Sequence, residues 1–364
     1  MATRLDLIFI GNIFVYNHSL QEYILRSIEN ESQFVNSITY FKNSDNRLFL
    51  YLEEQLNSES NLVIVTTKQN FTTVGKLICT ATSDNQILRD GMLIPQKASL
   101  FEERSYLLEH NSTTVNVLQI DEGQEMPELL ISSSETRATV HIFEEDKETV
   151  VNLLTPIAQT YEVTFDLTLE VQGWIRVDIF SKRYGDISKF IHGIKKLLPK
   201  KLIPSSNVLL YIIDKLAAAN KTVSFAESCT GGLLSYYFTK NNGASKVLHG
   251  SLVTYSNDLK ENWLAVSSQT LEEKGAVSYG VVEEMSEGAM NVSAADYAIS
   301  ISGIAGEGGG TKEKPVGTVY IGVRSHTAHK EEHLLFSGDR NYIQHQSALY
   351  AVKMLLLLDK ETFF

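Results

Sequence analysis

A strand that stops on small polar residues constrains the fold of this chain more than any other feature. It is the run Val223-Ser224-Phe225-Ala226-Glu227-Ser228-Cys229-Thr230-Gly231-Gly232, which begins as a buried strand and enters a helix through two glycines. The first turn of a helix leaves backbone N–H groups without partners, so the junction places a hydroxyl and a thiol beside free donors. A plain capping role for Ser228 or Thr230 explains the run equally well, and the rest of the chain has to decide.

The size and composition of the chain indicate a protein of several folded domains. Its 364 residues exceed the length at which single hydrophobic cores usually stop growing. The net charge is −12 and no basic run stands out, which disfavours nucleic acid as a partner. The two cysteines, Cys79 and Cys229, have neither disulfide nor metal-ligand spacing, so we expect a reduced protein with no metal site and no cofactor.

Neither a signal peptide nor a membrane span is expected. The apolar run Leu7-Ile8-Phe9-Ile10 has only the length of a strand and lacks a preceding basic segment. No stretch approaches the roughly 20 apolar residues that cross a bilayer. We therefore expect a cytoplasmic protein without a membrane partner.

The order of apolar runs and amphipathic patterns predicts an α/β fold. Residues 5–10 and 62–65 have the pattern of strands, with helical patterns over 20–28 and 48–56 between them, which predicts an α/β domain over residues 1–135. Alternating patterns later in the chain, at 139–143 and 174–180, predict a small α+β domain over residues 136–200. The basic segment 195–204 contains Leu198-Pro199 and Ile203-Pro204, and we interpret it as a linker.

Residues 201–364 are predicted to form a third domain, a three-layer α/β/α arrangement of one sheet flanked by helices. Besides the strand that runs into Ser228, strands are predicted over 250–255, 297–302, 318–324 and 332–336. Helices are predicted over 206–219, 271–274, 281–291 and 342–358. The terminal run Met354-Leu355-Leu356-Leu357-Leu358 is expected to pack in the core.

Four polar clusters of this third domain each lie at the end of a predicted strand. They span 226–232, 254–260, 302–310 and 312–318. Open α/β sheets assemble ligand sites from the loops at strand ends, so the clusters converge on one site. The loop Gly303–Gly310 has five glycines in eight residues, which lets backbone amides approach an anion, although a mobile surface loop would have the same composition. It matches neither a Walker A loop nor GxGxxG.

Five blocks together resemble the C-terminal domain of the CinA family. They are AESCTGG, VTYSNDLK, GAVS at Gly275–Ser278, SGIAGEGGGTKEKPVGT and FSGDR at Phe336–Arg340, and their order and spacing match over about residues 205–360. The resemblance implies a nicotinamide-nucleotide amidohydrolase of pyridine nucleotide salvage. Such an enzyme converts nicotinamide mononucleotide to nicotinic acid mononucleotide and ammonia, without a metal.

The resemblance also implies roles for individual residues. Ser228 would be the nucleophile, Lys260 its base if desolvation lowers the lysine pKa, and Tyr255 a partner of the base or the substrate. The substrate-binding residues would be Glu227, Thr230, Gly231, Gly232, Asn257, Ser302, Gly303, Ala305, Gly306, Lys314 and Arg340. Without the resemblance, Lys260 would be one more solvated helix lysine and Tyr255 a packing tyrosine with a wet hydroxyl.

Several alternatives stay open at these positions. Cys229 is a rival nucleophile, since a thiol at a helix N-terminus can have a lowered pKa. Asn257 is well placed to cap the helix that carries Lys260, and Asp339 to cap the final helix with Arg340 exposed. The family commonly has a second arginine where this chain has Gln344, and a proline where it has Glu307, so phosphate binding is weakened or shared with Lys312 or Lys314.

The N-terminal domain resembles molybdopterin-binding proteins, which in the CinA family is associated with metal-dependent ADP-ribose pyrophosphatase activity. An acidic turn of the family is replaced here by residues 11–15, and its GGLGPTxDD loop by residues 68–76, so the phosphate cradle and the paired carboxylates are missing. We expect a catalytically silent domain kept for packing, oligomerisation or regulation. A non-catalytic nucleotide- or partner-binding protein and a residual pyrophosphatase are the alternative functions, and a homodimer is expected by resemblance.

Overall fold

The computed structural model describes residues 5–31, 35–131, 137–181 and 184–364. The chain divides into two compact units, residues 1–135 and 136–364. The predicted domain boundary between residues 135 and 136 falls among residues 132–136, outside the described residues. Together the two units form a multi-domain α/β fold.

The first unit is built on a six-stranded sheet of order β2-β1-β3-β8-β7-β6, in which the first four strands are parallel. Its strands are β1 (Leu5–Ile10), β2 (Val35–Phe41), β3 (Asn61–Thr66), β6 (Leu100–Glu102), β7 (Ser105–His110) and β8 (Thr113–Gln119), and a separate hairpin is formed by β4 (Gln86–Arg89) and β5 (Met92–Pro95). Its helices are α1 (Asn12–Tyr16), α2 (His18–Asn30), α3 (Leu48–Gln55) and α4 (Lys68–Ala81).

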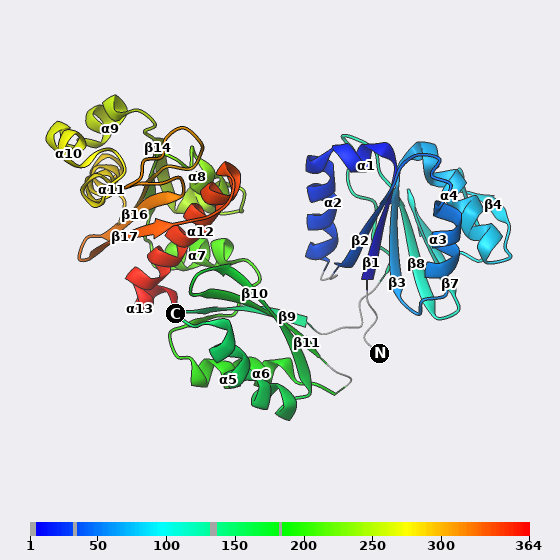
Figure 1. The fold of residues 1–364 in the computed structure, drawn as a ribbon. Coiled ribbons are helices and arrows are strands. Elements are labelled where there is room, and N and C mark those ends of the chain that lie inside the picture. Colours follow the sequence, from blue (N-terminus) through cyan, green and yellow to red (C-terminus); the bar gives the residue numbers. More distant parts are fainter. Residues whose placement is uncertain (1–4, 32–34, 132–136, 182–183) are drawn as a thin grey trace. The chain divides into compact units, whose positions relative to one another are not determined.

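Helices cover both faces of this first sheet (Figure 1). Side chains alternate along β1, so that Leu7 and Phe9 pack against α1 and α2, whereas Ile8 and Ile10 pack against α3 and α4. A parallel sheet buried on both faces needs apolar residues in succession, and the run at 5–10 supplies them. The α/β expectation for this part of the chain is therefore confirmed.

The second unit begins with a four-stranded antiparallel sheet of order β10-β11-β9-β12. Its elements are β9 (Arg137–Phe143), α5 (Lys147–Thr160), β10 (Val163–Val171), β11 (Trp174–Ser181), α6 (Ile187–Leu197) and β12 (Leu202–Ile203). Helices α5 and α6 cover one face of the sheet. On the other face Phe143 and Trp174 belong to the same hydrophobic core as the helices and strands that follow Asn207.

The interpretation of residues 195–204 as a linker is wrong. Lys195 and Lys196 lie in the last turn of α6, and Leu202 and Ile203 form β12, which pairs with β9. The two prolines do end the helix and the strand. Between them, however, there is room for a two-residue strand at the edge of the sheet, and both of its side chains are buried.

The rest of the second unit is a three-layer α/β/α arrangement around a five-stranded sheet of order β14-β13-β15-β16-β17. Strand β13 is parallel to β14 and β15, whereas β16 and β17 are antiparallel additions. The strands are β13 (Val223–Glu227), β14 (Leu248–Val253), β15 (Tyr297–Gly303), β16 (Thr318–Ser325) and β17 (His329–Leu335). All five lie within a few residues of the predicted ranges.

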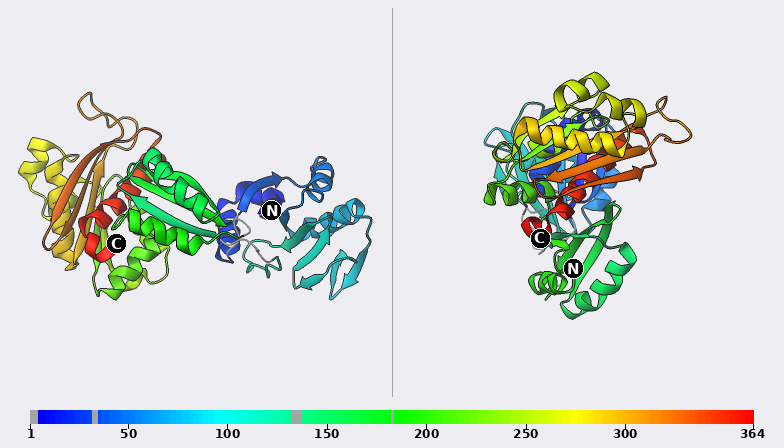
Figure 2. Two further views of the ribbon diagram at one scale, coloured as in Figure 1. Left: turned by 90° about the horizontal axis from the view of Figure 1, so that it is seen from below. Right: turned by 90° about the vertical axis from the view of Figure 1, so that its left-hand side faces the viewer.

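Two sets of helices sandwich this sheet (Figures 1 and 2). One face carries α7 (Val208–Ala218), α8 (Leu233–Thr239) and α12 (Arg340–Leu358), and the other carries α9 (Asn257–Leu264), α10 (Ser268–Lys274) and α11 (Tyr279–Ser293). The short elements η1 (Ala244–Lys246) and α13 (Lys360–Phe363) complete the chain. Met354, Leu355 and Leu356 are buried, which confirms the core role predicted for the end of α12.

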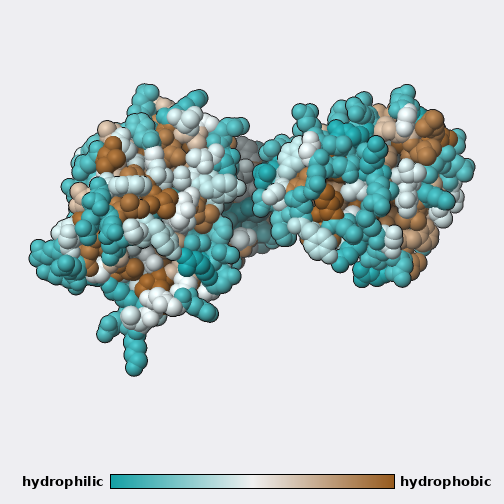
Figure 3. Space-filling view, turned by 90° about the horizontal axis from the view of Figure 1, so that it is seen from above, coloured by the Kyte–Doolittle hydropathy of each residue, from teal (hydrophilic) through white to brown (hydrophobic). Residues whose placement is uncertain are grey.

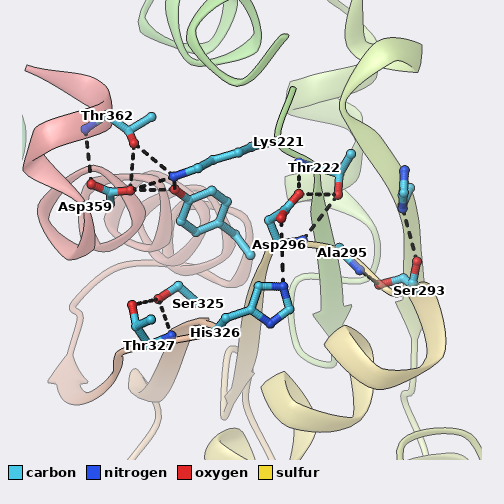
Figure 4. Close-up of polar contacts among 12 residues, drawn as sticks. Lys221, Thr222, Ser293, Ala295, Asp296, Ser325, His326, Thr327, Asp359 and Thr362 are labelled. Carbon is cyan, nitrogen blue, oxygen red and sulfur yellow. Dashed lines mark hydrogen bonds and ion pairs between the residues drawn. The ribbon is translucent and has the colours of Figure 1, made fainter. Parts of the chain in front are cut away.

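Polar contacts fasten the end of the sheet at which β13 and β15 begin (Figure 4). Lys221 Nζ donates to Tyr297 Oη at 2.7 Å and to Asp359 Oδ2 at 3.2 Å, and Tyr297 Oη donates to the same carboxylate at 2.6 Å. Thr222 N–H donates to Asp296 Oδ2 at 2.8 Å. These contacts tie α13 and two strand starts together, which leaves the carboxyl ends of the strands as the open edge of the sheet.

The surface view of Figure 3 shows hydrophobic residues in small groups among hydrophilic ones on both units. Large exposed side chains include Leu88 in β4 and Tyr255, Trp263 and Leu335 in the second unit. Within the described ranges, no helix has both the length and the apolar character that a membrane span requires.

Candidate active site

The site forms where three neighbouring strands end. Ser228, the first residue after β13, donates its backbone N–H to Ile301 O of β15 at 2.9 Å. Thr254, the first residue after β14, donates its N–H to Glu227 O at 2.9 Å. Because the strands end side by side, the loops that follow them converge.

Ser228 and Lys260 are in direct contact at this edge. Lys260 Nζ lies 3.1 Å from Ser228 Oγ, 2.8 Å from Thr254 O and 3.4 Å from Tyr255 O. The lysine is 1% exposed and the serine 8% exposed. A buried lysine with two carbonyl oxygens and one hydroxyl around its amine is held in a single place, in contrast with a solvated helix lysine.

The position of Lys260 depends on how α9 packs. Ser256 Oγ accepts a hydrogen bond from Leu259 N–H at 3.2 Å and is the N-cap of α9. The expected capping role of Asn257 is therefore wrong, because Asn257 is already the first helical residue and is exposed. At its other end α9 meets Gly288 of α11, where an added Cβ would lie 2.0 Å from Leu264 O. Only glycine permits this approach.

Burial shifts the pKa values of Lys260 and Cys229 in opposite directions. Desolvation lowers the pKa of Lys260 below its ordinary value, which favours the neutral amine. Desolvation raises the pKa of Cys229 to about 12, so its thiol stays protonated at neutral pH. Cys229 also points into the hydrophobic core, within reach of Gly303. The geometry therefore favours Ser228 over Cys229 as the nucleophile.

The turn after Ser228 uses two left-handed glycines. Gly231 has φ of +61° and Gly232 of +100°, conformations that side chains with a Cβ rarely adopt. Glu227 stabilises this turn, and its side chain is fully buried. Its carboxylate accepts hydrogen bonds from Gly232 N–H, Leu234 N–H and Ser235 N–H at 2.9–3.1 Å. A fourth bond comes from Ser251 Oγ at 3.1 Å. Glu227 was predicted to bind substrate, but its carboxylate already accepts hydrogen bonds from backbone N–H groups at the N-terminus of α8.

Arg340 and Tyr255 meet at the exposed rim of the site. Arg340 Nη2 donates to Tyr255 Oη at 2.9 Å, and both side chains are largely exposed. Arg340 also borders the glycine-rich loop, since a Cβ on Gly306 would lie 2.7 Å from Arg340 Nη1. Asp339 Oδ1 caps α12 by accepting from Tyr342 N–H at 2.8 Å, as expected. The loop and the arginine together can receive an anion.

Ser302 and Lys314 lie beside the segment 275–278. Ser302 Oγ donates to Ala276 O at 2.7 Å, and Lys314 Nζ donates to Lys274 O at 2.9 Å and to Val277 O at 2.7 Å. Both side chains thus have backbone partners before any ligand arrives. These bonds hold the segment 274–278 in place, and the Lys314 amine lies against that segment.

The other residues predicted to bind substrate lie at or near the loops that follow β13 and β15. Gly303 ends β15 and packs against Cys229, Ala305 is buried in the core behind the loop, and Gly306 faces Arg340. Thr230 is 4% exposed, and its Oγ1 has no hydrogen-bond partner among the described residues. Glu307 lies exposed in the loop.

Three contributors to the site were not predicted as such. Thr254 supplies a carbonyl that holds Lys260, Gly288 admits α9, and Gln344 Nε2 donates to Cys229 O at 2.6 Å. Thr254 stands in the block VTYSNDLK and Gln344 is a departure from the family pattern, so a sequence feature pointed to each of these positions. Gly288 sits within an ordinary helical pattern, and no sequence feature pointed to it.

Part of the second unit is similar to a known protein family. A family model described as the CinA C-terminal domain matches residues 206–358. Among solved structures, the competence/damage inducible protein CihA from Agrobacterium tumefaciens is 35% identical, with 43% of this chain and 96% of that chain covered and a TM-score of 0.41. Through this domain the chain belongs to the CinA family.

Curated CinA-like proteins are also similar to this chain. The CinA-like protein of Thermotoga maritima is 48% identical over 144 residues, which cover 40% of this chain and 35% of that protein. The CinA-like protein of Prochlorococcus marinus strain MIT 9215 is 37% identical over 219 residues, which cover 57% of this chain and 50% of that protein. The matches thus span half the length of these relatives or less.

In the first unit of this CinA protein, amides gather at segments 11–15 and 68–76, the two segments that replace the family's acidic turn and GGLGPTxDD loop. Asn43 Oδ1 accepts from Asn70 Nδ2 at 2.8 Å, and Asn12 Oδ1 accepts from Asn43 N–H at 3.0 Å. Asn70 Nδ2 also donates to Thr67 Oγ1 at 3.1 Å. Over the ranges that the structure describes, no group of three or more His, Cys, Asp or Glu residues could hold a metal ion. That this unit has no catalytic activity stays a prediction.

Proposed function

We propose that this protein is a metal-independent nicotinamide-nucleotide amidase. It would hydrolyse the carboxamide of nicotinamide mononucleotide to nicotinic acid mononucleotide and ammonia, with Ser228 as nucleophile and Lys260 as base. The observation that carries the proposal is the 3.1 Å contact between Lys260 Nζ and Ser228 Oγ in a buried setting. Membership of the CinA family supplies the substrate class.

The neighbours of Lys260 suit a neutral amine that acts as a base. Thr254 O and Tyr255 O can only accept hydrogen bonds. When the amine is neutral it has two N–H donors and one lone pair, so the two carbonyls take the donors and the lone pair faces the Ser228 hydroxyl. The lowered pKa of Lys260 increases the fraction of lysine in this form.

The reaction then proceeds through an ester on Ser228. Ser228 Oγ attacks the carboxamide carbon while its proton passes to Lys260, which gives a tetrahedral intermediate. Lys260 returns that proton to the departing nitrogen, and ammonia leaves. A water molecule, deprotonated by Lys260, attacks the ester, and nicotinic acid mononucleotide is released as the proton returns to Ser228 Oγ.

The rim of the site offers contacts to the phosphate of the nucleotide. The Arg340 guanidinium can form two parallel hydrogen bonds to phosphate oxygens, and backbone N–H groups of the adjacent glycine-rich loop add further donors. Glu307 is exposed in that loop and places a negative charge near the anion. We therefore propose weaker phosphate binding than in a CinA domain with proline at this position.

Ammonia release tests the function. Purified full-length protein is incubated with nicotinamide mononucleotide in the presence of EDTA, beside the Ser228→Ala variant. Release by the wild type that is lost in the variant supports the amidase. Nucleotide binding without turnover would instead indicate a binding module, and hydrolysis of ADP-ribose that depends on added metal would indicate a pyrophosphatase.

A further inference from the structure

Gln344 reaches from α12 to the turn that carries Ser228. It lies one helical turn after Arg340, and its Nε2 donates to Cys229 O at 2.6 Å. Helix α12 and helix α8, which follows the turn, pack together on the same face of the sheet (Figure 1). The amide side chain of Gln344 thus determines the direction of one peptide group next to the nucleophile.

That peptide group joins Cys229 to Thr230. A trans peptide is planar, so its C=O and its N–H point in opposite directions. With Cys229 O turned toward α12, the Thr230 N–H points away from α12. Lys260 belongs to α9, which packs on the opposite face of the sheet from α12, and its amine contacts Ser228 Oγ. Gln344 therefore holds the Thr230 N–H on the side of the turn that faces the reacting groups.

The Thr230 N–H is available for a ligand, whereas three of the backbone donors around it are engaged. Ser228 N–H donates to Ile301 O, Gly231 N–H to Ser228 O, and Gly232 N–H to the Glu227 carboxylate. In the part of the chain that the structure describes, the Thr230 N–H donates no hydrogen bond. Thr230 itself is almost wholly buried, so this donor is shielded from bulk water.

We propose that Gln344 is a positioning residue for an oxyanion donor, the Thr230 N–H, in the amidase reaction. The inference rests on the proposed function. A donor held in place before the reaction stabilises the tetrahedral oxyanion without reorganising, and such donors commonly contribute 10²–10³-fold to kcat. Gln344 touches no reacting atom; it acts through the Cys229–Thr230 peptide.

This role differs from that of the second arginine which the CinA resemblance places at this position. A guanidinium there would contribute charge toward the phosphate. The Gln344 amide is uncharged, and its Nε2 is engaged with a backbone carbonyl on the inner side of the turn. The phosphate contact is thus left to Arg340, and substitutions at 344 and 340 should affect different kinetic constants.

Two substitutions and one matched control separate positioning from general packing. Gln344→Glu keeps the shape of the side chain but replaces the donor with an acceptor that repels Cys229 O, and Gln344→Ala removes the contact. The control is Gln346→Ala, because Gln346 Nε2 makes the same kind of bond from the same helix, to Glu170 O at 3.2 Å, far from the turn. Gln344→Arg restores N–H donors.

Kinetics with nicotinamide mononucleotide supply the first readout. We expect kcat to fall about 10–100-fold in Gln344→Glu and Gln344→Ala while KM changes less than about threefold. Gln344→Arg should recover kcat relative to Gln344→Glu, and Gln346→Ala should keep the wild-type values. Equal kcat in the wild type and Gln344→Glu, or a loss seen in KM alone, would overturn the inference.

A second readout does not require amide hydrolysis. A fluorophosphonate probe forms a bond from Ser228 Oγ to phosphorus and expels fluoride, and its phosphoryl oxygen occupies the same oxyanion position. We expect the labelling rate of Ser228, measured by mass spectrometry, to fall in Gln344→Glu by the same factor as kcat. If the wild type is labelled but hydrolyses no nicotinamide mononucleotide, the proposed function fails while the inference is still tested. An equal labelling rate in the wild type and Gln344→Glu, or a wild type that is not labelled at all, would overturn the inference.

Discussion

Lys260 Nζ lies 3.1 Å from Ser228 Oγ, although 32 residues separate the two in the chain. The serine follows strand β13, whereas the lysine lies on helix α9, which comes after strand β14. Their contact therefore depends on the tertiary fold. The same amine is bound to the carbonyl of Thr254, which follows the neighbouring strand. Chemistry at this edge therefore depends on the alignment of two parallel strands as much as on the side chains.

The two candidate nucleophiles should respond differently to removal. Ser228→Ala should reduce kcat at least 10³-fold, because no other hydroxyl is bound to Lys260 in the described structure. Cys229→Ala should leave activity within about tenfold of the wild type, since the buried thiol has its pKa raised to about 12. Steady-state rates of ammonia release measure both. Loss of activity in Cys229→Ala with retention in Ser228→Ala would reverse the assignment.

The proposed base, Lys260, acts in its neutral form, so the rate should rise with pH. Below the pKa of Lys260 in the folded enzyme, kcat/KM should increase about tenfold per pH unit and then level off. The midpoint should lie below the ordinary lysine value of about 10.4, since burial lowers the pKa of Lys260. A pH profile of kcat/KM in metal-free buffer measures this midpoint.

Variants of Lys260 provide the control for that profile. Lys260→Arg stays protonated at every accessible pH and should lose about 10³-fold in rate without a basic recovery. Lys260→Met should also remove a pH dependence of stability. In the wild type the unfolded chain binds the Lys260 proton more tightly, so stability should rise with pH between the folded and unfolded pKa values. A wild-type kcat/KM that stays flat below the pKa of Lys260 in the folded protein would contradict the assigned base.

Gly288→Ala should disturb the lysine from a distance. The new Cβ would lie 2.0 Å from Leu264 O, so the end of α9 has to move away from α11. We expect a loss of about 1–3 kcal/mol in unfolding free energy and a fall in kcat of tenfold or more. Chemical denaturation and steady-state kinetics measure the two effects.

Gly280→Ala is the matched control for that substitution. Gly280 lies on the same helix, but the atoms nearest to its new Cβ are side-chain atoms of Lys274 and Thr270, at 3.1 Å, and not backbone. Stability and kcat should stay near wild type. Equal effects of the two substitutions would show that helix α11, not the approach of α9, determines the loss.

Removal of Arg340 should weaken phosphate recognition more than chemistry. Hydrogen bonds to charged groups contribute about 1.5–3 kcal/mol, so Arg340→Ala should raise KM for nicotinamide mononucleotide about 10–100-fold. Nicotinamide riboside lacks the phosphate, and its kcat/KM should be nearly the same in the variant and the wild type. An equal loss with both substrates would assign Arg340 to the reaction and not to the phosphate.

Glu227→Gln should destabilise the nucleophile turn. The carboxylate accepts four hydrogen bonds while fully buried, and the amide group of glutamine would turn donors toward donors. We expect a loss of about 2–3 kcal/mol in unfolding free energy, measured by urea denaturation. Glu272→Gln, on the exposed side of α10, should change stability by less than about 0.5 kcal/mol. A neutral Glu227→Gln would contradict the capping role.

Local patterns predicted the strands and the shared edge of the sheet. Apolar runs of strand length alternating with amphipathic helices fix an α/β order, and strands that lie parallel end at one edge. The convergence of Ser228, Tyr255 and Arg340 follows from this order, since each comes shortly after a strand. The patterns could not give the contact between Ser228 and Lys260, because it depends on the approach of α9 to Gly288.

Choices between neighbouring polar residues also escaped prediction. Ser256 and Asn257 are both good caps, and only the helix start decides that Ser256 Oγ receives the N–H. Glu227 has the residue type of a ligand at a strand end, but the N-terminus of α8 lies over it and takes both of its oxygens. Prolines at 199 and 204 indicated a linker, whereas two buried residues between them extend a sheet.

Phe143 and Trp174 bear on how this protein can be divided for experiments. Both belong to the small antiparallel sheet, yet they are core residues of the part that carries Ser228, and the Phe143 ring meets that of Phe364 with centroids 5.5 Å apart. A fragment that starts near residue 206 would expose an apolar surface on α7, α12 and α13 to water. Recombinant fragments intended for kinetics or crystallisation should therefore begin before Arg137.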